Sequence, residues 1–325
     1  MQQSILIIGA GAVGQVYAWH FAQAGHDVHL FLKAKHVAEA ERGFTLYDLN
    51  RDRKRRNPML FNQFTCHSDW SAVAARRWDQ VWLCMSSAAL AQTDLQPLVQ
   101  AIGDATVMVL QPGPDDIRRV QQAVGEQRVV SGMITMMSYH APLAGETVPT
   151  PGIAFWIPPL APMAVDGRRD RADAVIATLK HSGIRAAYRP GFNDQGMHAT
   201  GFLMVFLAAL ELSGWKFRAM ERTRLQTMKA AQAEVRAALA GRYGVKGPWL
   251  LSCVPAALIP PAMTLSRHMT PVDIEVFLEA HFSKVRPQTL ALLDQYAAHA
   301  AELGLPHTAL DSLRAELAAV SHGPD

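Results

Sequence analysis

Three glycines near the N-terminus form the first pattern in the sequence whose spacing suits the binding of a ligand. Gly9, Gly11 and Gly14 stand in the segment GAGAVG with the spacing GxGxxG. Glycine permits a tight turn at the first position, lets a pyrophosphate approach the backbone at the second, and allows close helix–strand packing at the third. The free N–H groups that begin the helix then face the phosphates. The pattern indicates a dinucleotide site that comprises Gly9, Ala10, Gly11, Ala12, Val13 and Gly14.

The elements around these glycines must form a strand, a turn, a helix and a second strand. Residues 4–8, SILII, are a short apolar run typical of a buried strand. An amphipathic helix is expected over residues 12–24, and HDVHLFL reads as the second strand. This order within about 30 residues is the context that the motif requires. The alternative is a glycine-rich turn in an α/β fold without a ligand.

The residues after the second strand bear on the choice between NAD and NADP. An acidic residue there usually binds the ribose 2′-hydroxyl of NAD. In this chain the strand ends in FLKAKH, with Lys33 and Lys35, and no carboxylate follows before Glu39. Two cations favour a 2′-phosphate, so NADPH is the expected cofactor. Ordinary solvated lysines are the alternative.

Three later strands are expected to end at the same edge of the sheet. They are WDQVWLCM, TVMVLQPG and RVVSGMITMMSYH, the last read as one long strand. Loops at the carboxyl ends of parallel strands line the nucleotide crevice. Ser86 and Gln111 are therefore expected to bind the cofactor, and Ser87 and His140 are expected near it.

A basic run, NRDRKRRN, joins the expected strands GFTLYDL and PMLFNQFTC. A solvated hairpin tip is favoured over a nucleic-acid site, because no aromatic residues interleave the charges. The formal net charge of +3 is also too small to argue for a nucleic-acid partner. Further along, residues 149–162 contain five prolines, and an edge strand with loops is expected there.

The chain is predicted to contain two domains. A helix over residues 169–182 and a strand in IRAAYR complete a nucleotide-binding domain at 1–190. Helices are expected over residues 195–214 and 216–241, followed by the apolar, proline-broken PWLLSCVPAALIPPAM. Thr270-Pro271 is expected to begin another helix, which Pro287 kinks or divides. The fold class is therefore α/β, with an N-terminal Rossmann domain followed by an all-α C-terminal domain at 191–325.

The cysteine positions and the hydropathy argue against a disulfide-rich, a metal-binding or a membrane-spanning protein. Cys66, Cys84 and Cys253 are far apart and form no CxxC or Cys/His cluster, so neither a disulfide framework nor a metal site is expected. The most apolar segment, residues 202–210, is about half the length that crosses a bilayer. No secretory signal is visible, and a cytoplasmic protein without a membrane partner is expected.

The chain resembles the ketopantoate reductase (2-dehydropantoate 2-reductase) family in four features. These are the glycine motif, the lysines after the second strand, a later strand that ends in QxG, and a long apolar helix that begins an all-helical half. The resemblance covers nearly the whole chain. It implies a helical domain like the C-terminal domain of 6-phosphogluconate dehydrogenase. It also implies that NADPH reduces a 2-keto acid or a related carbonyl compound in the cleft between the two domains. A homodimer is one possible assembly.

The site residues depart from the family pattern. Ser86 stands where the family has a lysine, and Gln111-Pro112-Gly113 stands where it has Gln-Asn-Gly. The family's catalytic lysine falls at the start of the long helix, where no lysine occurs between Lys180 and Lys216. His198 is closest in register and is the expected proton donor. The family's substrate-side glutamate corresponds to Asp273 or Glu275.

These departures favour a substrate other than ketopantoate. A pocket that has lost polar groups favours a bulkier, less polar carbonyl compound, because unpaired polar groups are costly to bury. There are two alternatives. One is true ketopantoate reduction with rearranged residues, and the other is an NADP(H)-binding protein without turnover, acting as a sensor or an interaction partner.

Overall fold

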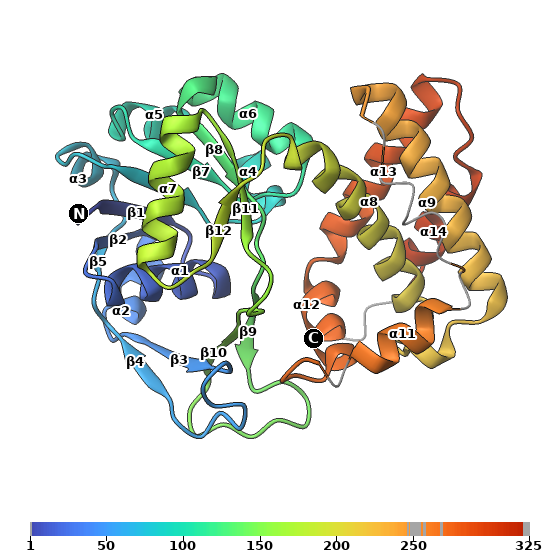
Figure 1. Ribbon diagram of the computed structural model, residues 1–325, viewed down its shortest axis with the longest axis horizontal. Coiled ribbons are helices and arrows are strands. Elements are labelled where there is room, and N and C mark those ends of the chain that lie inside the picture. Colours follow the sequence, from blue (N-terminus) through green and yellow to red (C-terminus); the bar gives the residue numbers. More distant parts are fainter. Residues whose placement is uncertain (1, 246, 248–254, 256–257, 267–268, 321–325) are drawn as a thin grey trace. The chain divides into compact units, whose positions relative to one another are not determined.

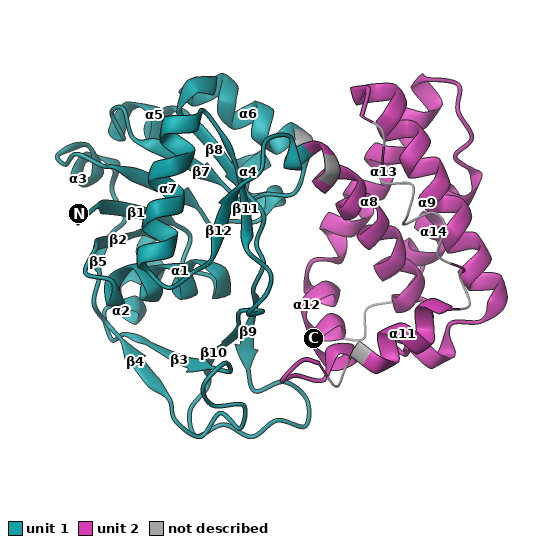
Figure 2. Cartoon of the chain, viewed as in Figure 1, with its two compact units in different colours: residues 1–193 teal, residues 194–325 magenta. Residues whose placement is uncertain are grey.

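The computed structural model describes residues 2–245, 247, 255, 258–266 and 269–320. Contacts divide the chain into two compact units, Met1–Asn193 and Asp194–Asp325, which Figure 2 shows in teal and magenta. The division falls three residues after the boundary expected at residue 190. Most of the segment PWLLSCVPAALIPPAM, including Cys253, lies outside the described residues.

The first unit is built on an eight-stranded sheet with the order β12-β11-β8-β7-β6-β1-β2-β5 (Figure 1). Its strands are β1 (Ser4–Ile8), β2 (Asp27–Phe31), β5 (Thr65–His67), β6 (Gln80–Leu83), β7 (Thr106–Val109), β8 (Val129–Gly132), β11 (Met163–Gly167) and β12 (Ala186–Tyr188). The six neighbouring strands β8-β7-β6-β1-β2-β5 of this sheet pair in parallel, and β11 pairs antiparallel with β8. The parallel part contains β1 and β2, the strands on either side of the glycine turn and α1.

Alternation along each strand supplies two apolar layers. Ile5 and Ile7 of β1 pack on one face, against helices α1 (Ala12–Gln23) and α7 (Arg169–His181). Leu6 and Ile8 pack on the other face, against α3 (Trp70–Ala74), α4 (Ser87–Gln92), α5 (Gln96–Ala101) and α6 (Pro114–Val124). Because the parallel strands are covered on both faces, they read as continuous apolar runs in the sequence.

A second sheet, with the order β4-β3-β10-β9, corrects three expectations. Its strands are β3 (Phe44–Asp48), β4 (Met59–Phe61), β9 (Met137–Ala141) and β10 (Gly152–Trp156). The segments PMLFNQFTC and RVVSGMITMMSYH are each two strands divided between the sheets. The expected edge strand is the interior strand β10, paired with both β3 and β9. All five nearby prolines lie outside β10, so its backbone N–H groups remain available to both neighbours.

The basic run forms the tip of the β3–β4 hairpin, as expected, but one of its arginines points inward. Arg55 is buried, and its Nε and Nη2 donate to the Tyr139 hydroxyl at 2.9 and 2.6 Å. Its Nη2 also lies 2.7 Å from a Glu146 carboxylate oxygen. Asp52 accepts backbone N–H groups of the tip, which lowers the pKa of its carboxyl. Arg55 therefore anchors the tip, and the expectation of a wholly solvated run is wrong for this residue.

Helix α8 (Phe192–Glu211) spans the boundary between the units and supplies the core of the second. The other described helices of this unit are α9 (Arg222–Tyr243), α11 (Ile259–Ser266), α12 (Ile274–Lys284), α13 (Arg286–Glu302) and α14 (Thr308–Ala318). Residues 202–210 of α8 are buried except Leu203, which is 43% exposed. This enclosure is what an all-round apolar helix requires.

The starts of the later helices follow capping chemistry. Asp273, rather than Thr270, is the N-cap of α12, and its carboxylate accepts the N–H groups of Glu275 and Val276. Carboxylates are preferred over threonine at this position. Pro287 lies in the first turn of α13 and divides the segment into two helices, one of the two outcomes expected. In the described part of the chain, no helix combines the length and the apolar character needed to span a membrane.

Candidate functional site

The glycine turn has the geometry that its spacing predicts. Gly9 has a φ of +99°, and a Cβ built on it would lie 2.9 Å from the carbonyl oxygen of Cys84. A Cβ on Gly14 would lie 2.1 Å from the Gly9 oxygen, which no side chain tolerates. Gly11 is exposed, and its Cβ would meet nothing within 4 Å. The first and third glycines are thus required by the fold, while the second leaves open space beside the backbone.

The start of helix α1 offers backbone donors to that space. Gly11 is its N-cap and brings no side chain to cap the helix, and no acidic residue stands in the first turn. The N–H groups of such a first turn have no partner inside the helix. Gln15 fixes the turn from behind, because its side-chain amide donates to the Ala10 oxygen at 2.8 Å. Ala12 and Val13 are partly buried between this turn and the core. A helix start of this kind is suited to an anion.

Strand order places this turn at a crevice. β1 lies between β2 and β6, and the chain reverses its direction of winding there. Ligands of open α/β sheets bind outside the carboxyl ends of strands at such a switch point. Cys84, which follows β6, packs under Gly14, and burial raises the pKa of its thiol. The thiol therefore stays neutral and adds no negative charge beneath a phosphate.

Lys33 and Lys35 lie at the end of β2, as the sequence predicts. Lys33 is the N-cap of α2 (Ala34–Ala40), and both lysines are exposed. Neither side chain makes a hydrogen bond or an ion pair within the described residues. Next to them Phe31 stacks on Trp70, with ring centroids 3.9 Å apart. The two ammonium groups are therefore uncommitted.

Ser86 and Gln111 both make hydrogen bonds within the first unit, but their surroundings differ. The Ser86 hydroxyl accepts the Ala89 N–H at 3.2 Å and caps α4. Gln111 is buried, and its amide nitrogen donates to the carbonyl oxygens of Leu83 and Met85 at 2.9 and 2.7 Å. Gln111 thus ties the end of β7 to the end of β6 and to the loop that follows it. A direct contact of either side chain with the cofactor stays a prediction.

His198 does not stand at an accessible entrance. Its side chain is 0% exposed, and Nε2 lies 3.0 Å from the Val245 carbonyl oxygen. Its Nδ1 has no hydrogen-bond partner among the described residues. A Cβ on Gly247 would lie 2.8 Å from that nitrogen. The ring is therefore enclosed by its own unit, because a backbone segment far along the chain covers it.

The two candidate carboxylates of α12 differ in surroundings. Asp273 spends one carboxylate oxygen on capping the helix. Glu275 accepts the Phe217 N–H at 2.8 Å, and its second oxygen lies 3.4 Å from the Lys216 ammonium. Of the two, only Glu275 lines a pocket of the second unit.

That pocket, termed here the Lys216 pocket, has a volume of about 390 Å³. Its described lining is Lys216, Phe217, Arg218, Ala219, Thr264 and Glu275. Sequence reasoning missed Lys216 and Arg218, because it sought a lysine only at the start of the long helix. The available signal was the cationic pair in WKFR, directly after that helix.

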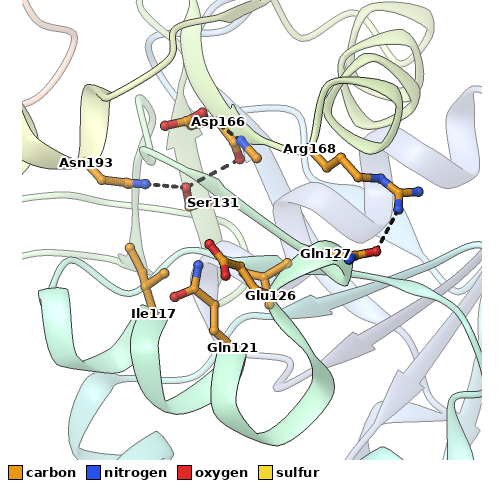
Figure 3. Close-up of a pocket in the computed structure, with 10 residues that line it drawn as sticks. Ile117, Gln121, Glu126, Gln127, Ser131, Asp166, Arg168 and Asn193 are labelled. Atoms are coloured by element: carbon orange, nitrogen blue, oxygen red, sulfur yellow. Dashed lines mark hydrogen bonds between the residues drawn. The ribbon is translucent and has the colours of Figure 1, made fainter.

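Another pocket, of about 380 Å³, lies in the first unit beside α6 and β8 (Figure 3). Asn193 reaches into it and donates to the Ser131 hydroxyl at 2.7 Å, and Arg168 contacts Gln127 at 3.3 Å. Side chains of both donor and acceptor type face this space. None of the residues predicted from the sequence to bind cofactor or substrate lines it.

Comparisons with known proteins agree with this geometry. Residues 5–148 match the family model "Ketopantoate reductase PanE/ApbA". A 2-dehydropantoate 2-reductase from Geobacter metallireducens GS-15 superposes with a TM-score of 0.71 at 14% identity, over 98% of this chain and 100% of the other. A PanE/ApbA family ketopantoate reductase from Ralstonia eutropha JMP134 gives 0.71 at 20%, over 97% of each chain.

A D-mandelate dehydrogenase in complex with NADH and anilino(oxo)acetate also gives a TM-score of 0.71, at 14% identity and over 97% of each chain. No protein with a curated function matches the chain in sequence. The solved structures therefore support the fold of the whole chain, and the family model matches its N-terminal part. Residues 5–148 are thus similar to the ketopantoate reductase PanE/ApbA family, and the whole chain has the fold of the solved ketopantoate reductases.

Proposed function

We propose that the protein is an NADPH-dependent reductase of a carbonyl compound, and that its substrate is not ketopantoate. The observation that carries the proposal is the glycine turn. Gly9 and Gly14 admit no side chain, whereas Gly11 and the uncapped start of α1 face open space. The open side of the turn fits a pyrophosphate, and the fold itself does not require a glycine at position 11, because a side chain there would meet nothing within 4 Å.

The cofactor assignment rests on Lys33 and Lys35. Both ammonium groups are exposed and uncommitted at the end of β2, where a 2′-phosphate would lie. NADPH, when bound, supplies the hydride for carbonyl reduction. The D-mandelate dehydrogenase with this fold was solved with NADH, so the fold alone does not select between the two cofactors.

Carbonyl reduction also needs a proton and stabilisation of the developing alkoxide. The enclosure of His198 disfavours it as the donor, although its assignment stays a prediction. Of the two candidate carboxylates, Glu275 is the better placed on the substrate side, because it lines a pocket and has Lys216 beside it. Asp273 keeps one carboxylate oxygen for α12 and is the weaker candidate. The cytoplasmic location and the homodimer are further predictions.

A turnover assay tests the proposal. NADPH oxidation is followed with a panel of 2-keto acids, aryl keto acids and simple ketones, with ketopantoate included. The proposal predicts turnover with at least one bulky carbonyl compound and little with ketopantoate. A kcat/KM for ketopantoate at or above about 10⁴ M⁻¹s⁻¹ would overturn the substrate assignment. NADPH binding without turnover of any carbonyl compound would favour the sensor alternative.

A further inference from the structure

The Lys216 pocket carries more positive than negative charge. Lys216 and Arg218 flank Phe217 in the 3-10 turn η2 (Phe217–Ala219), and Glu275 supplies the one carboxylate of the described lining. Phe217 is buried, so it anchors the turn that presents both cations. Two cations and one carboxylate leave one positive charge uncompensated.

The contacts of Glu275 show how the cations are presented. One carboxylate oxygen accepts the Phe217 N–H at 2.8 Å, which fixes the carboxylate against η2. The other oxygen lies 3.4 Å from the Lys216 ammonium. An ammonium has three donors, so this contact leaves two for another acceptor. Glu275 therefore orients Lys216 without saturating it.

Arg218 is exposed and makes no side-chain hydrogen bond or ion pair within the described residues. Its guanidinium offers paired donors that match a carboxylate or a phosphate. Thr264 does not compete for such a group, since its hydroxyl donates to the Pro260 oxygen at 2.8 Å. Among the described lining side chains, the uncommitted donors are thus both cationic.

We propose that the Lys216 pocket binds an anionic group of the substrate, a carboxylate or a phosphate, with Lys216 and Arg218 as its ligands and Glu275 as the residue that positions Lys216. This inference rests on the proposed function and gives its substrate a negative charge. It revises the expectation of a less polar substrate, because the cations of this pocket suit a charged group. The volume of about 390 Å³ suits a small anionic ligand.

Calorimetric titration of the full chain without cofactor tests the inference. The probes are oxamate, its neutral analogue oxamide, and phenyl phosphate. The variants are Lys216→Met, which keeps an unbranched apolar stem, Arg218→Ala and Glu275→Gln. Lys284→Ala, at the far end of the same helix as Glu275, is the matched control, and thermal unfolding verifies the fold of each variant.

The anionic probes should bind at least tenfold more tightly than oxamide, and added salt should weaken them. Lys216→Met and Arg218→Ala should each weaken the preferred anion about tenfold, and Lys284→Ala should not. Glu275→Gln should bind the anion as tightly as wild type or more tightly, because it removes the opposing charge. The tighter of the two anions identifies the group as carboxylate or phosphate.

Equal binding of oxamate and oxamide, or unchanged anion affinity in both cationic variants, would overturn the inference. These results are independent of turnover. If the anion binds here while NADPH does not bind the chain, the proposed function fails and the pocket assignment stands. If NADPH binds and the anions do not, only the pocket assignment fails.

Discussion

Substitution of alanine for two of the three motif glycines should separate folding from cofactor binding. A methyl group on Gly14 would lie 2.1 Å from the Gly9 oxygen and 3.2 Å from the Cys84 Cβ. Neither backbone nor buried side chain can yield without distorting the turn, so Gly14→Ala should destabilise the fold by about 1–3 kcal/mol or more. A methyl group on Gly11 would meet nothing within 4 Å, and the φ of −71° suits alanine.

Gly11→Ala should therefore change the free energy of unfolding by less than about 1 kcal/mol, because a small loss in N-cap preference opposes a gain in unfolded-state entropy. Its methyl group occupies the space through which the pyrophosphate approaches. Loss of one charged hydrogen bond is worth about 1.5–3 kcal/mol, so NADPH affinity should fall about tenfold or more.

Urea unfolding and calorimetric titration with NADPH measure the two effects. Gly25→Ala serves as a control for glycine removal, since Gly25 has a φ of +80° and open surroundings far from the turn. It should lose some stability and no cofactor affinity. The reasoning is refuted if Gly11→Ala binds NADPH as wild type does, or if it loses as much stability as Gly14→Ala.

Three further predictions concern charged and titrating groups. The double variant Lys33→Ala, Lys35→Ala should lose a preference for NADPH over NADH of about tenfold, measured by calorimetry; equal affinity for both cofactors in the wild type would contradict this. His198→Ala should lower the free energy of unfolding by about 1–3 kcal/mol, since it removes a buried hydrogen bond; a loss of kcat at unchanged stability would instead restore His198 as the proton donor. Burial lowers the pKa of His29, and the Asp27 carboxylate opposes this shift. The neutral ring therefore stabilises the fold at a pH above the pKa of about 6.5 that the ring has in the unfolded chain. This contribution to the unfolding free energy is lost as the pH falls toward the lower pKa of the folded state. Between roughly pH 7.5 and 5.5 the wild type should lose more unfolding free energy than His29→Gln, and equal losses would refute the assignment.

The sequence predicts local features of this fold well, because they depend on near neighbours. The glycine spacing, the strand before it and the helix after it all follow from contacts within about 30 residues. The division of α12 from α13 at Pro287 is equally local, since it follows from the missing N–H of proline. Strand pairing is not local. The interior position of β10 depends on β3, about a hundred residues earlier.

The candidate site shows the same limit. His198 is the right residue type at the right register, but its enclosure depends on Val245 and Gly247, which no pattern near the helix reveals. Lys216 and Glu275 meet only through a fold that joins residues 59 positions apart. Arg55 is one arginine in a cationic run, and only its contact with Tyr139, 84 positions away, distinguishes it from its neighbours.

Titration of the wild-type chain with NADPH and with NADH tests the central claim most directly, because every functional step depends on the nucleotide site. The account predicts saturable binding of one NADPH per chain, with NADH at least about tenfold weaker. Absence of NADPH binding by a folded chain would contradict it, since the open space at Gly11 and the free lysines after β2 would then serve no nucleotide.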